Sequence, residues 1–183
     1  GEIDEAALAG LQVVGEADLP FEPLGDLDDA VVVAQTEFAG NTYRFEIERS
    51  GRYQCDWVSS EVGSGGGCAG RVDPDAVITI DGSAGTDPGS RPGTVDAVRS
   101  GSVTAAAAVV EVEFADGTIV RVEPTDLSGA FEERFWIAGA TISNESQTRL
   151  PVSEETVAAV RAYDAAGNLL GTAVPPWLLP DDG

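Results

Sequence analysis

The two cysteines of this chain, Cys55 and Cys68, are the first residues whose type and spacing could do chemistry. They belong to the segment YQCDWVSSEVGSGGGCAG, in which a glycine run precedes the second cysteine. The run lacks the Lys and Ser/Thr of a phosphate loop, and the pair lacks Cys-x-x-Cys redox spacing. Structural zinc sites need about four Cys or His ligands, which this chain does not have. We therefore expect a disulfide across a glycine-rich loop that turns back; two buried free thiols are the alternative.

Other reactive side chains are scarce in the sequence. There is no histidine, and every one of the 10 basic residues is arginine. Ser-His-Asp, Cys-His and lysine Schiff-base chemistry are therefore excluded. A glycan hydrolase needs only two carboxylates, but among 32 acidic residues such a pair arises by chance. The sequence thus predicts a protein that is not an enzyme and needs no cofactor.

Acidic residues also gather in loops, where oxygen ligands suit calcium. The candidate ligands are Asp26, Asp28, Asp29, Asp73, Asp75, Asp81 and Asp87. None of these segments has the spacing of an EF-hand loop. We therefore favour plain acidic loops and predict no metal site, with these aspartates as weak calcium candidates.

Four aromatic residues are candidates for a binding surface: Trp57, Phe135, Trp136 and Trp177. Tryptophans can stack on sugars, although the hydrophobic core is their more frequent place. Phe135 and Trp136 are neighbours in a strand-like segment, so their side chains point to opposite faces. One of the two must then be less buried, or lie beneath a loop or a partner. Trp177, in the tail PPWLLPDDG, either docks on the domain or contacts another protomer.

The charge balance limits the partners. The net charge of -22 repels nucleic-acid backbones and anionic lipid headgroups, so neither nucleic acid nor an anionic membrane is expected to bind. Cations, basic proteins and neutral glycans remain as partners. The chain contains no apolar run of membrane-span length. Because it begins GEIDEAALAG, without methionine or a leader, we interpret it as mature or trimmed.

The elements that must position these residues are short strands. Alternating polar and apolar residues, interrupted by turn signals such as Ala39-Gly40-Asn41, Asp116-Gly117 and Ala166-Gly167-Asn168, are typical of antiparallel hairpins. A helix from Ser153 onward is the alternative to the last hairpin. The strand-like segments lie within residues 30–51, 52–59, 76–82, 108–124, 131–142 and 157–174, and residues 82–94 are expected to form a long loop.

This pattern predicts an all-β, antiparallel β-sandwich-like domain of about eight to ten strands. With 43% hydrophobic residues, the chain can build one core. We place this domain at residues 30–174, between an N-terminal lead-in or arm (1–29) and a C-terminal tail (175–183). One short helix near the N-terminus, over residues 3–11, is compatible with the spacing of apolar residues there.

The order of these motifs resembles a known group. A hairpin ending in YRFEI is followed by Cys55, GGGC, VEVEFADGTIVRVEP, RFWIA and VRAYDAAGNLLG. This order, over roughly residues 30–173, is similar to β-rich ectodomains of uncharacterised actinobacterial secreted or single-pass membrane proteins. The resemblance implies an all-β domain outside the cytoplasm with a paired-cysteine loop, and it implies no catalytic residues.

The function that these observations predict is non-enzymatic binding or sensing at a cell envelope. The domain would be extracellular, or membrane-anchored and facing outside, because disulfides persist in oxidising compartments. Its partner would be a protein or glycan at the cell surface. The first alternative is a structural subunit of a surface assembly or filament, which associates with itself through its terminal segments. The second alternative is a carboxylate-based glycan hydrolase.

Overall fold

The computed structural model describes residues 30–50, 53–70, 76–86, 89–127, 130–143 and 156–175. This part of the chain contains eleven strands and no helix, which confirms the all-β class and rules out, within these ranges, a helix that could span a membrane. The strands are β1 (Val31–Phe38), β2 (Asn41–Ser50), β3 (Tyr53–Ser60), β4 (Gly63–Gly70), β5 (Ser83–Thr86), β6 (Thr94–Val103), β7 (Val109–Phe114), β8 (Ile119–Val122), β9 (Arg134–Ser143), β10 (Val157–Tyr163) and β11 (Leu169–Ala173). The proposed helix over residues 3–11 lies outside the described residues.

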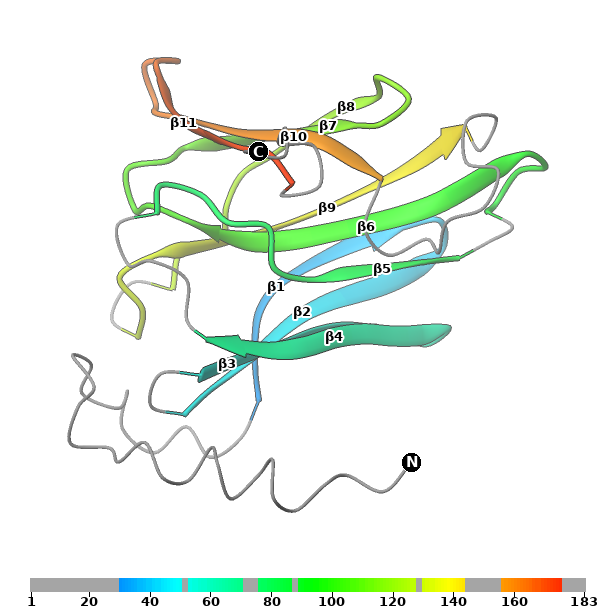
Figure 1. Cartoon of the computed structure of the whole chain (residues 1–183), viewed down its shortest axis with the longest axis horizontal. Coiled ribbons are helices and arrows are strands. Elements are labelled where there is room, and N and C mark those ends of the chain that lie inside the picture. The colour runs from blue at the N-terminus through cyan, green and yellow to red at the C-terminus, as the bar shows by residue number, and fades with distance from the viewer. Residues whose placement is uncertain are drawn as a thin grey trace, which may run out of the picture.

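The strands form three antiparallel sheets stacked in layers (Figure 1). We name them by their place in Figure 1. The lower sheet has the order β1-β2-β3-β4, the middle sheet β5-β6-β9, and the upper sheet β11-β10-β7-β8. The middle sheet therefore has a covering layer on each face, which makes this sandwich one layer thicker than a simple pair of sheets.

Two hydrophobic cores fill the spaces between the layers. Strand β9 contributes to both, because successive side chains of a strand point to opposite faces. Trp136 and Ala138 pack in the upper core, whereas Phe135 and Ile137 pack in the lower core. Phe135 and Trp136 are 0% and 1% exposed, so neither lies on a binding surface, and this part of our prediction is wrong. Both side chains are buried because another sheet packs on each face of β9.

The first hairpin folds as its sequence indicates. Phe38 pairs with Asn41, so Ala39 and Gly40 form a two-residue turn, with φ angles of 49° and 78°. Two positive φ angles are those of a type I′ turn, which matches the twist of the strands it connects. Tyr43, Phe45 and Ile47 alternate inward from β2 and are buried in the lower core.

The two hairpins of the upper sheet are also confirmed. The β7–β8 turn contains Asp116 and Gly117, and Gly117 has a φ of 85°. In the β10–β11 turn, Asp164 Oδ1 accepts hydrogen bonds from the backbone N–H groups of Ala166 and Asn168. Val157–Tyr163 forms strand β10, so the helix alternative is wrong for these residues, while 151–155 lie outside the described part.

The region around the glycine run differs from the prediction in two ways. The run itself is strand β4, and the chain turns before it, at Glu61 and Val62. Residues 76–82 form an irregular extended segment along β6, and regular pairing begins only at Ser83, inside the segment expected to be loop. Gly82 allows this segment to lie close to β6, since a Cβ at that position would lie 2.4 Å from the Ser100 hydroxyl.

Candidate binding groove between two sheet edges

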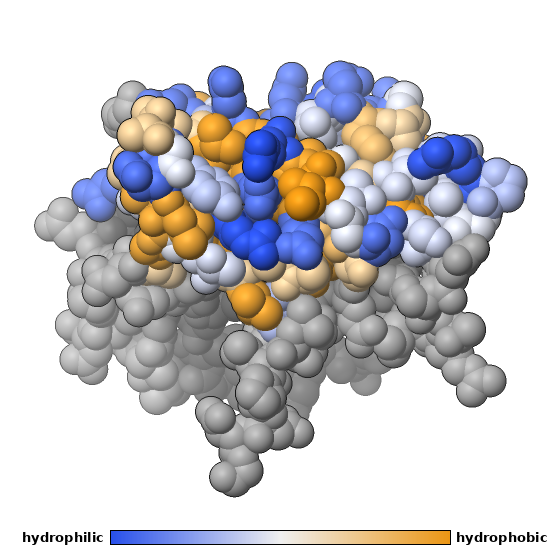
Figure 2. All heavy atoms as spheres, turned by 90° about the horizontal axis from the view of Figure 1, so that it is seen from above, coloured by the Kyte–Doolittle hydropathy of each residue, from blue (hydrophilic) through white to orange (hydrophobic). Residues whose placement is uncertain are grey.

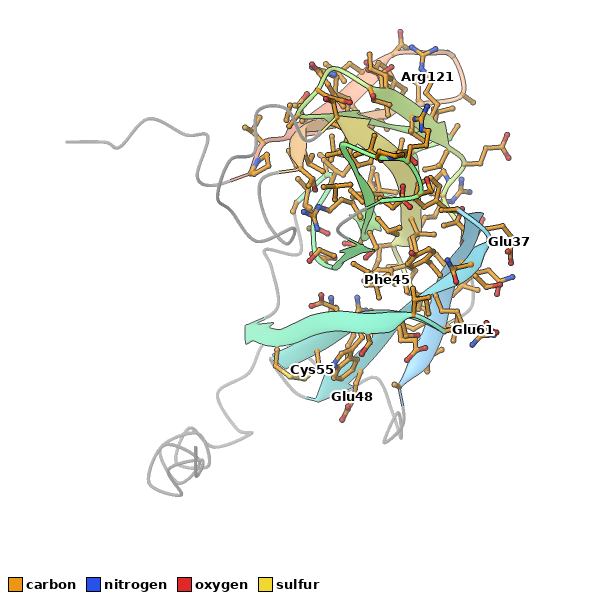
Figure 3. The ribbon with its side chains drawn as sticks, turned by 90° about the vertical axis from the view of Figure 1, so that its right-hand side faces the viewer. Glu37, Phe45, Glu48, Cys55, Glu61 and Arg121 are labelled. Carbon is orange, nitrogen blue, oxygen red and sulfur yellow. A yellow bond between two sulfur atoms is a disulfide. The ribbon has the colours of Figure 1, made fainter. Side chains whose placement is uncertain are left out.

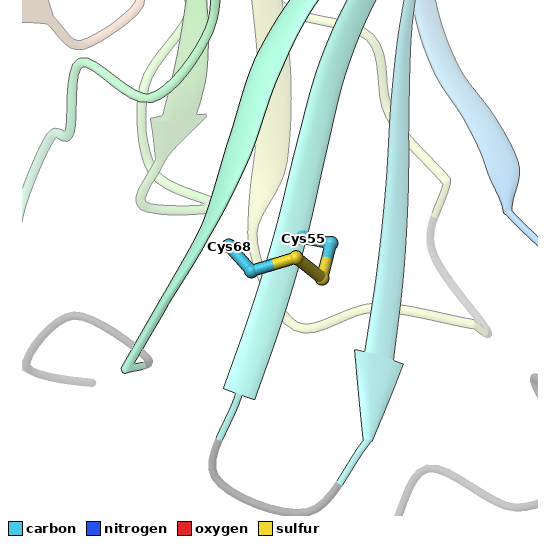
Figure 4. Close-up of a disulfide and its surroundings, with 2 residues drawn as sticks. All are labelled: Cys55 and Cys68. Carbon is cyan, nitrogen blue, oxygen red and sulfur yellow. A yellow bond between two sulfur atoms is a disulfide. The ribbon is translucent and has the colours of Figure 1, made fainter. Parts of the chain in front are cut away.

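The disulfide between Cys55 and Cys68 joins β3 to β4 (Figure 4). The two residues lie directly opposite in the strand pairing, with Cα atoms 4.0 Å apart and an S–S bond of 2.01 Å. The expected disulfide is present, and the free-thiol alternative is wrong. A disulfide of this kind suggests an oxidising, extracellular environment.

Five of the eight residues of β4 are glycines, and two of them are required by close neighbours. A Cβ at Gly65 would lie 2.5 Å from the backbone oxygen of Ser83 on β5. A Cβ at Gly66 would lie 2.8 Å from Trp57 Cδ1, and closer still to the backbone of β3. Because glycine has no Cβ, the backbones of β4 and β5 come into contact, and the Trp57 indole lies against Gly66.

Strands β4 and β5 are both edge strands, one of the lower and one of the middle sheet. Figure 1 shows them side by side on the same side of the molecule. Within the described residues, each pairs with one strand only, β3 and β6 respectively. Such edges leave backbone N–H and C=O groups unpaired, and proteins usually protect them with charges, prolines or bulges. Strand β4, GSGGGCAG, has no charged residue and no proline, and its pairing with β3 is regular.

A groove of about 500 Å³ opens between these two edges. Its volume falls in the range of small-ligand sites, and its walls combine hydroxyl groups, glycine backbone and one carboxylate. Burial is the largest cause of the raised pKa of Tyr43, so its phenol is neutral at physiological pH. The lining residues are Tyr43, Ser60, Val62, Gly63, Ser64, Gly65, Gly66, Asp81, Ser83, Ala84 and Gly85.

Asp81 is the one carboxylate among the groove's lining residues. Thr79 Oγ1 donates a hydrogen bond of 2.8 Å to its Oδ2, and the carboxyl is partly buried. The pKa of Asp81 is raised to about 6, chiefly by burial; the Thr79 hydrogen bond lowers it, Asp56 raises it, and Arg49 lowers it. No arginine of the described ranges forms an ion pair with Asp81. At neutral pH the groove therefore carries a negative charge that lacks a direct counter-ion.

Arg49, a buried cation whose charge lowers the pKa of Asp81, is engaged elsewhere. Its guanidinium lies 5.3 Å from the ring centre of Phe131 and 5.8 Å from that of Phe135. It also donates to Gln54 and pairs with Glu133. Our sequence analysis missed Arg49, although the alternation of Tyr43, Phe45 and Ile47 continues to this residue and so predicts its inward direction.

The remaining predicted site residues do not meet at the groove. Trp57 lies on the outer face of the lower sheet with the disulfide, because Cys55 and Trp57 are two residues apart on β3. Trp177 lies outside the described residues. So do the calcium candidates Asp26, Asp28, Asp29, Asp73, Asp75 and Asp87. Among the described residues, no three acidic or cysteine side chains gather to hold a metal.

A second set of charges covers the outer face of the upper sheet. Glu111 accepts two hydrogen bonds from Arg121, of 2.8 and 2.7 Å, and pairs with Arg161, which also pairs with Glu113. The Arg121 hydrogen bond is the largest cause that lowers the pKa of Glu111. Figure 2, seen from above, shows strongly polar residues in the middle of this face with apolar ones beside them. Figure 3 places Arg121 at the opposite end of the molecule from Glu48 and Cys55.

Comparison with protein families, curated proteins and solved structures gives no match to this chain. The candidate function therefore rests on the geometry and charge of the groove.

Proposed function

We propose that this chain is a non-enzymatic binding or sensing domain at a cell envelope, and that its ligand binds in the groove between β4 and β5. The observation that carries the proposal is the charge of Asp81. Its carboxylate lies in a groove walled by hydroxyl groups and backbone, without an ion pair to any described arginine. A group that is costly to keep charged, at the wall of a groove, is typical of a functional site.

The composition of the groove favours binding over catalysis. Hydroxyl groups and unpaired backbone groups at sheet edges recognise ligands by hydrogen bonding, as small-molecule and peptide sites do. Among the lining residues, Asp81 is the one group that titrates near neutral pH. The chain contains no histidine or lysine. Acid–base chemistry normally needs a second positioned group.

The disulfide supports a place outside the cytoplasm, where oxidising conditions preserve it. We propose either secretion or a membrane anchor that leaves the domain facing outside, as the resemblance to actinobacterial ectodomains implies. The protein isolated from its native source is alkylated with and without prior reduction, and its intact mass is measured. We expect alkyl groups on Cys55 and Cys68 only after reduction; two groups without reduction would contradict the compartment.

The binding site is tested with the oxidised protein on arrays of cell-surface glycans and surface proteins. Asp81→Asn removes the charge of the groove, and Glu48→Gln removes one charge from the outer face of the lower sheet as a matched control. We expect binding that Asp81→Asn abolishes and Glu48→Gln preserves. Equal binding by both variants would place the site elsewhere, and no binding to any probe would refute the proposal.

The edge of β4, with which no described strand other than β3 pairs, favours a second candidate, a structural subunit of a surface assembly. Edge strands without charges or prolines pair readily with strands of other chains. Size-exclusion chromatography with light scattering at several protein concentrations separates the two functions. Concentration-dependent growth into oligomers would support the assembly, whereas a monomer throughout supports the binding domain.

A further inference from the structure

We propose that the occupant of the groove is an extended peptide with basic side chains, which pairs with β4 as an added strand and brings an arginine or lysine to Asp81. This inference rests on the proposed binding function and names the class of its ligand. Three features of the described residues carry it: the edge of β4, the glycines on its inner face and the charge of Asp81.

The edge of β4 is suited to an added strand. Eight residues is long enough for several backbone hydrogen bonds, and the strand carries neither a charge nor a proline that would obstruct a partner. The Cys55–Cys68 disulfide fastens this edge strand to β3, so the edge is held in an extended form before the peptide arrives. A partner strand then meets a preorganised edge, which reduces the entropy lost on binding.

Part of the inner face of β4 is open to the side chains of that strand. Gly65 lies opposite Val58, which is buried in the lower core, so Gly63, Gly65 and Gly67 face the middle sheet. Alternate side chains of an added strand point to this same face. Nothing lies within 4 Å of the Cβ positions of Gly63 and Gly67, whereas Gly65 is covered by Ser83 of β5. Side chains that pass the two open glycines can reach the space that Asp81 and the hydroxyl groups enclose.

The charge of Asp81 selects a basic side chain. The charged groups that act on it are Asp56 from β3, which adds negative charge, and Arg49 from β2, which is bound to Gln54 and Glu133. A cation in the groove would therefore compensate a carboxylate that no described arginine pairs with. The net charge of -22 would also attract a basic peptide from a distance.

Other occupants fit these features less well. A neutral glycan could use the hydroxyl groups but would leave Asp81 uncompensated and the edge of β4 unpaired. A second copy of this chain would bring the same uncharged β4 strand and another net charge of -22, so the two copies would repel each other.

The test uses the oxidised full chain and synthetic peptides that alternate threonine with arginine or with glutamate, capped at both ends. Affinities are measured by fluorescence anisotropy, and hydrogen exchange of the β4 amides is followed with and without peptide. We expect the arginine peptide to bind and slow exchange in β4, and Asp81→Asn to weaken binding by about tenfold or more, with Glu48→Gln unchanged within about twofold. Two N-methylated peptides, each modified at one of the two alternating sets of residues, are compared. One of them should lose binding, because only one set of N–H groups faces β4 in an added strand.

Equal affinity for the glutamate peptide, unreduced affinity of both N-methylated peptides, or unchanged exchange in β4 would each overturn the inference. A glycan that binds in an Asp81-dependent manner, while none of the peptides does, would also overturn it but would leave the proposed binding function standing. Formation of a dimer that protects β4 without peptide would identify the second copy as the occupant and refute the peptide.

Discussion

Two carboxylates in different parts of the molecule, Glu111 on the upper sheet and Asp81 beside the middle sheet, have opposite electrostatic surroundings. Glu111, on the upper sheet, receives Arg121 and Arg161, and its pKa is lowered by the Arg121 hydrogen bond. Asp81, at the groove, accepts a hydrogen bond from the Thr79 hydroxyl, and its pKa is raised to about 6, chiefly by burial. The first charge stabilises the native fold, whereas the second opposes it, as is common where a protein maintains a binding site.

The arginines are divided in the same uneven way. Two of the chain's 10 basic residues, Arg121 and Arg161, serve Glu111 and Glu113 on an outer face. Arg49, which lies near the groove, pairs with Glu133 instead of Asp81. Although the chain has few cations, two of them pair with Glu111 and Glu113, and no described arginine pairs with Asp81. Mutations can test this contrast between Glu111 and Asp81.

The largest expected effect comes from removing the disulfide that holds one wall of the groove. Replacing both cysteines, Cys55→Ser with Cys68→Ser, releases a loop with a sequence separation of 13 residues. Loop-closure entropy predicts a loss of about 3 kcal/mol in the free energy of unfolding. Urea denaturation of the double variant and of the wild-type protein measures it. A loss well below 1 kcal/mol would mean that β4 holds its place without the bond.

The contact between β4 and β5 offers a matched pair of glycine variants. Gly65→Ala places a methyl group against the backbone of Ser83 and should cost about 2 kcal/mol of stability. Gly67→Ala is the control, because nothing lies within 4 Å of its Cβ position. Thermal and urea denaturation compare the two. Equal stability of both variants would contradict the close approach of the two edges.

Asp81→Asn should raise the free energy of unfolding at neutral pH, unlike the two changes above, which lower it. The folded pKa of Asp81 is raised above its unfolded value, so its protonated form favours folding at low pH and this contribution is lost as the pH rises through about 6. The variant should therefore be more stable than wild type by about 1 to 2 kcal/mol at pH 7.5, and nearly equal to it at pH 3.5. Urea denaturation across this pH range measures the difference. A variant that is less stable at pH 7.5 would show that Asp81 has a compensating partner.

Glu111→Gln removes the carboxylate that is paired with arginines, and we expect it to change the free energy of unfolding least. The folded pKa of Glu111 is lowered, so its contribution is present above the unfolded pKa and is lost as the pH falls through the folded pKa. Because Arg121 is mostly exposed, solvent screens the pair, and we expect a loss of about 1 kcal/mol at pH 7. The loss should disappear in acid, as urea denaturation at pH 3 and pH 7 would show. A gain in stability at pH 7 would remove the contrast with Asp81.

Local patterns predicted most of the strands correctly. The turn at Ala39-Gly40, the Asp116-Gly117 hairpin and the alternation of Tyr43, Phe45 and Ile47 depend on neighbouring residues, and the structure has them as expected. The glycine run was harder, because glycine has little preference for strands. It becomes β4 through pairing with β3 and through the disulfide, and both of these depend on residues elsewhere in the chain.

The sequence by itself determined the all-β class, the hairpins, the cysteine pair and the strong negative charge, because these follow from period, turn chemistry and composition. Only the tertiary structure decided that a third layer buries both Phe135 and Trp136, and that Asp81 meets the hydroxyl groups of β3, β4 and β5 at one groove. The physical reason is that burial and the surroundings of a carboxylate are set by strands far apart in sequence. A pattern read along one strand gives the direction of each side chain but not what covers it.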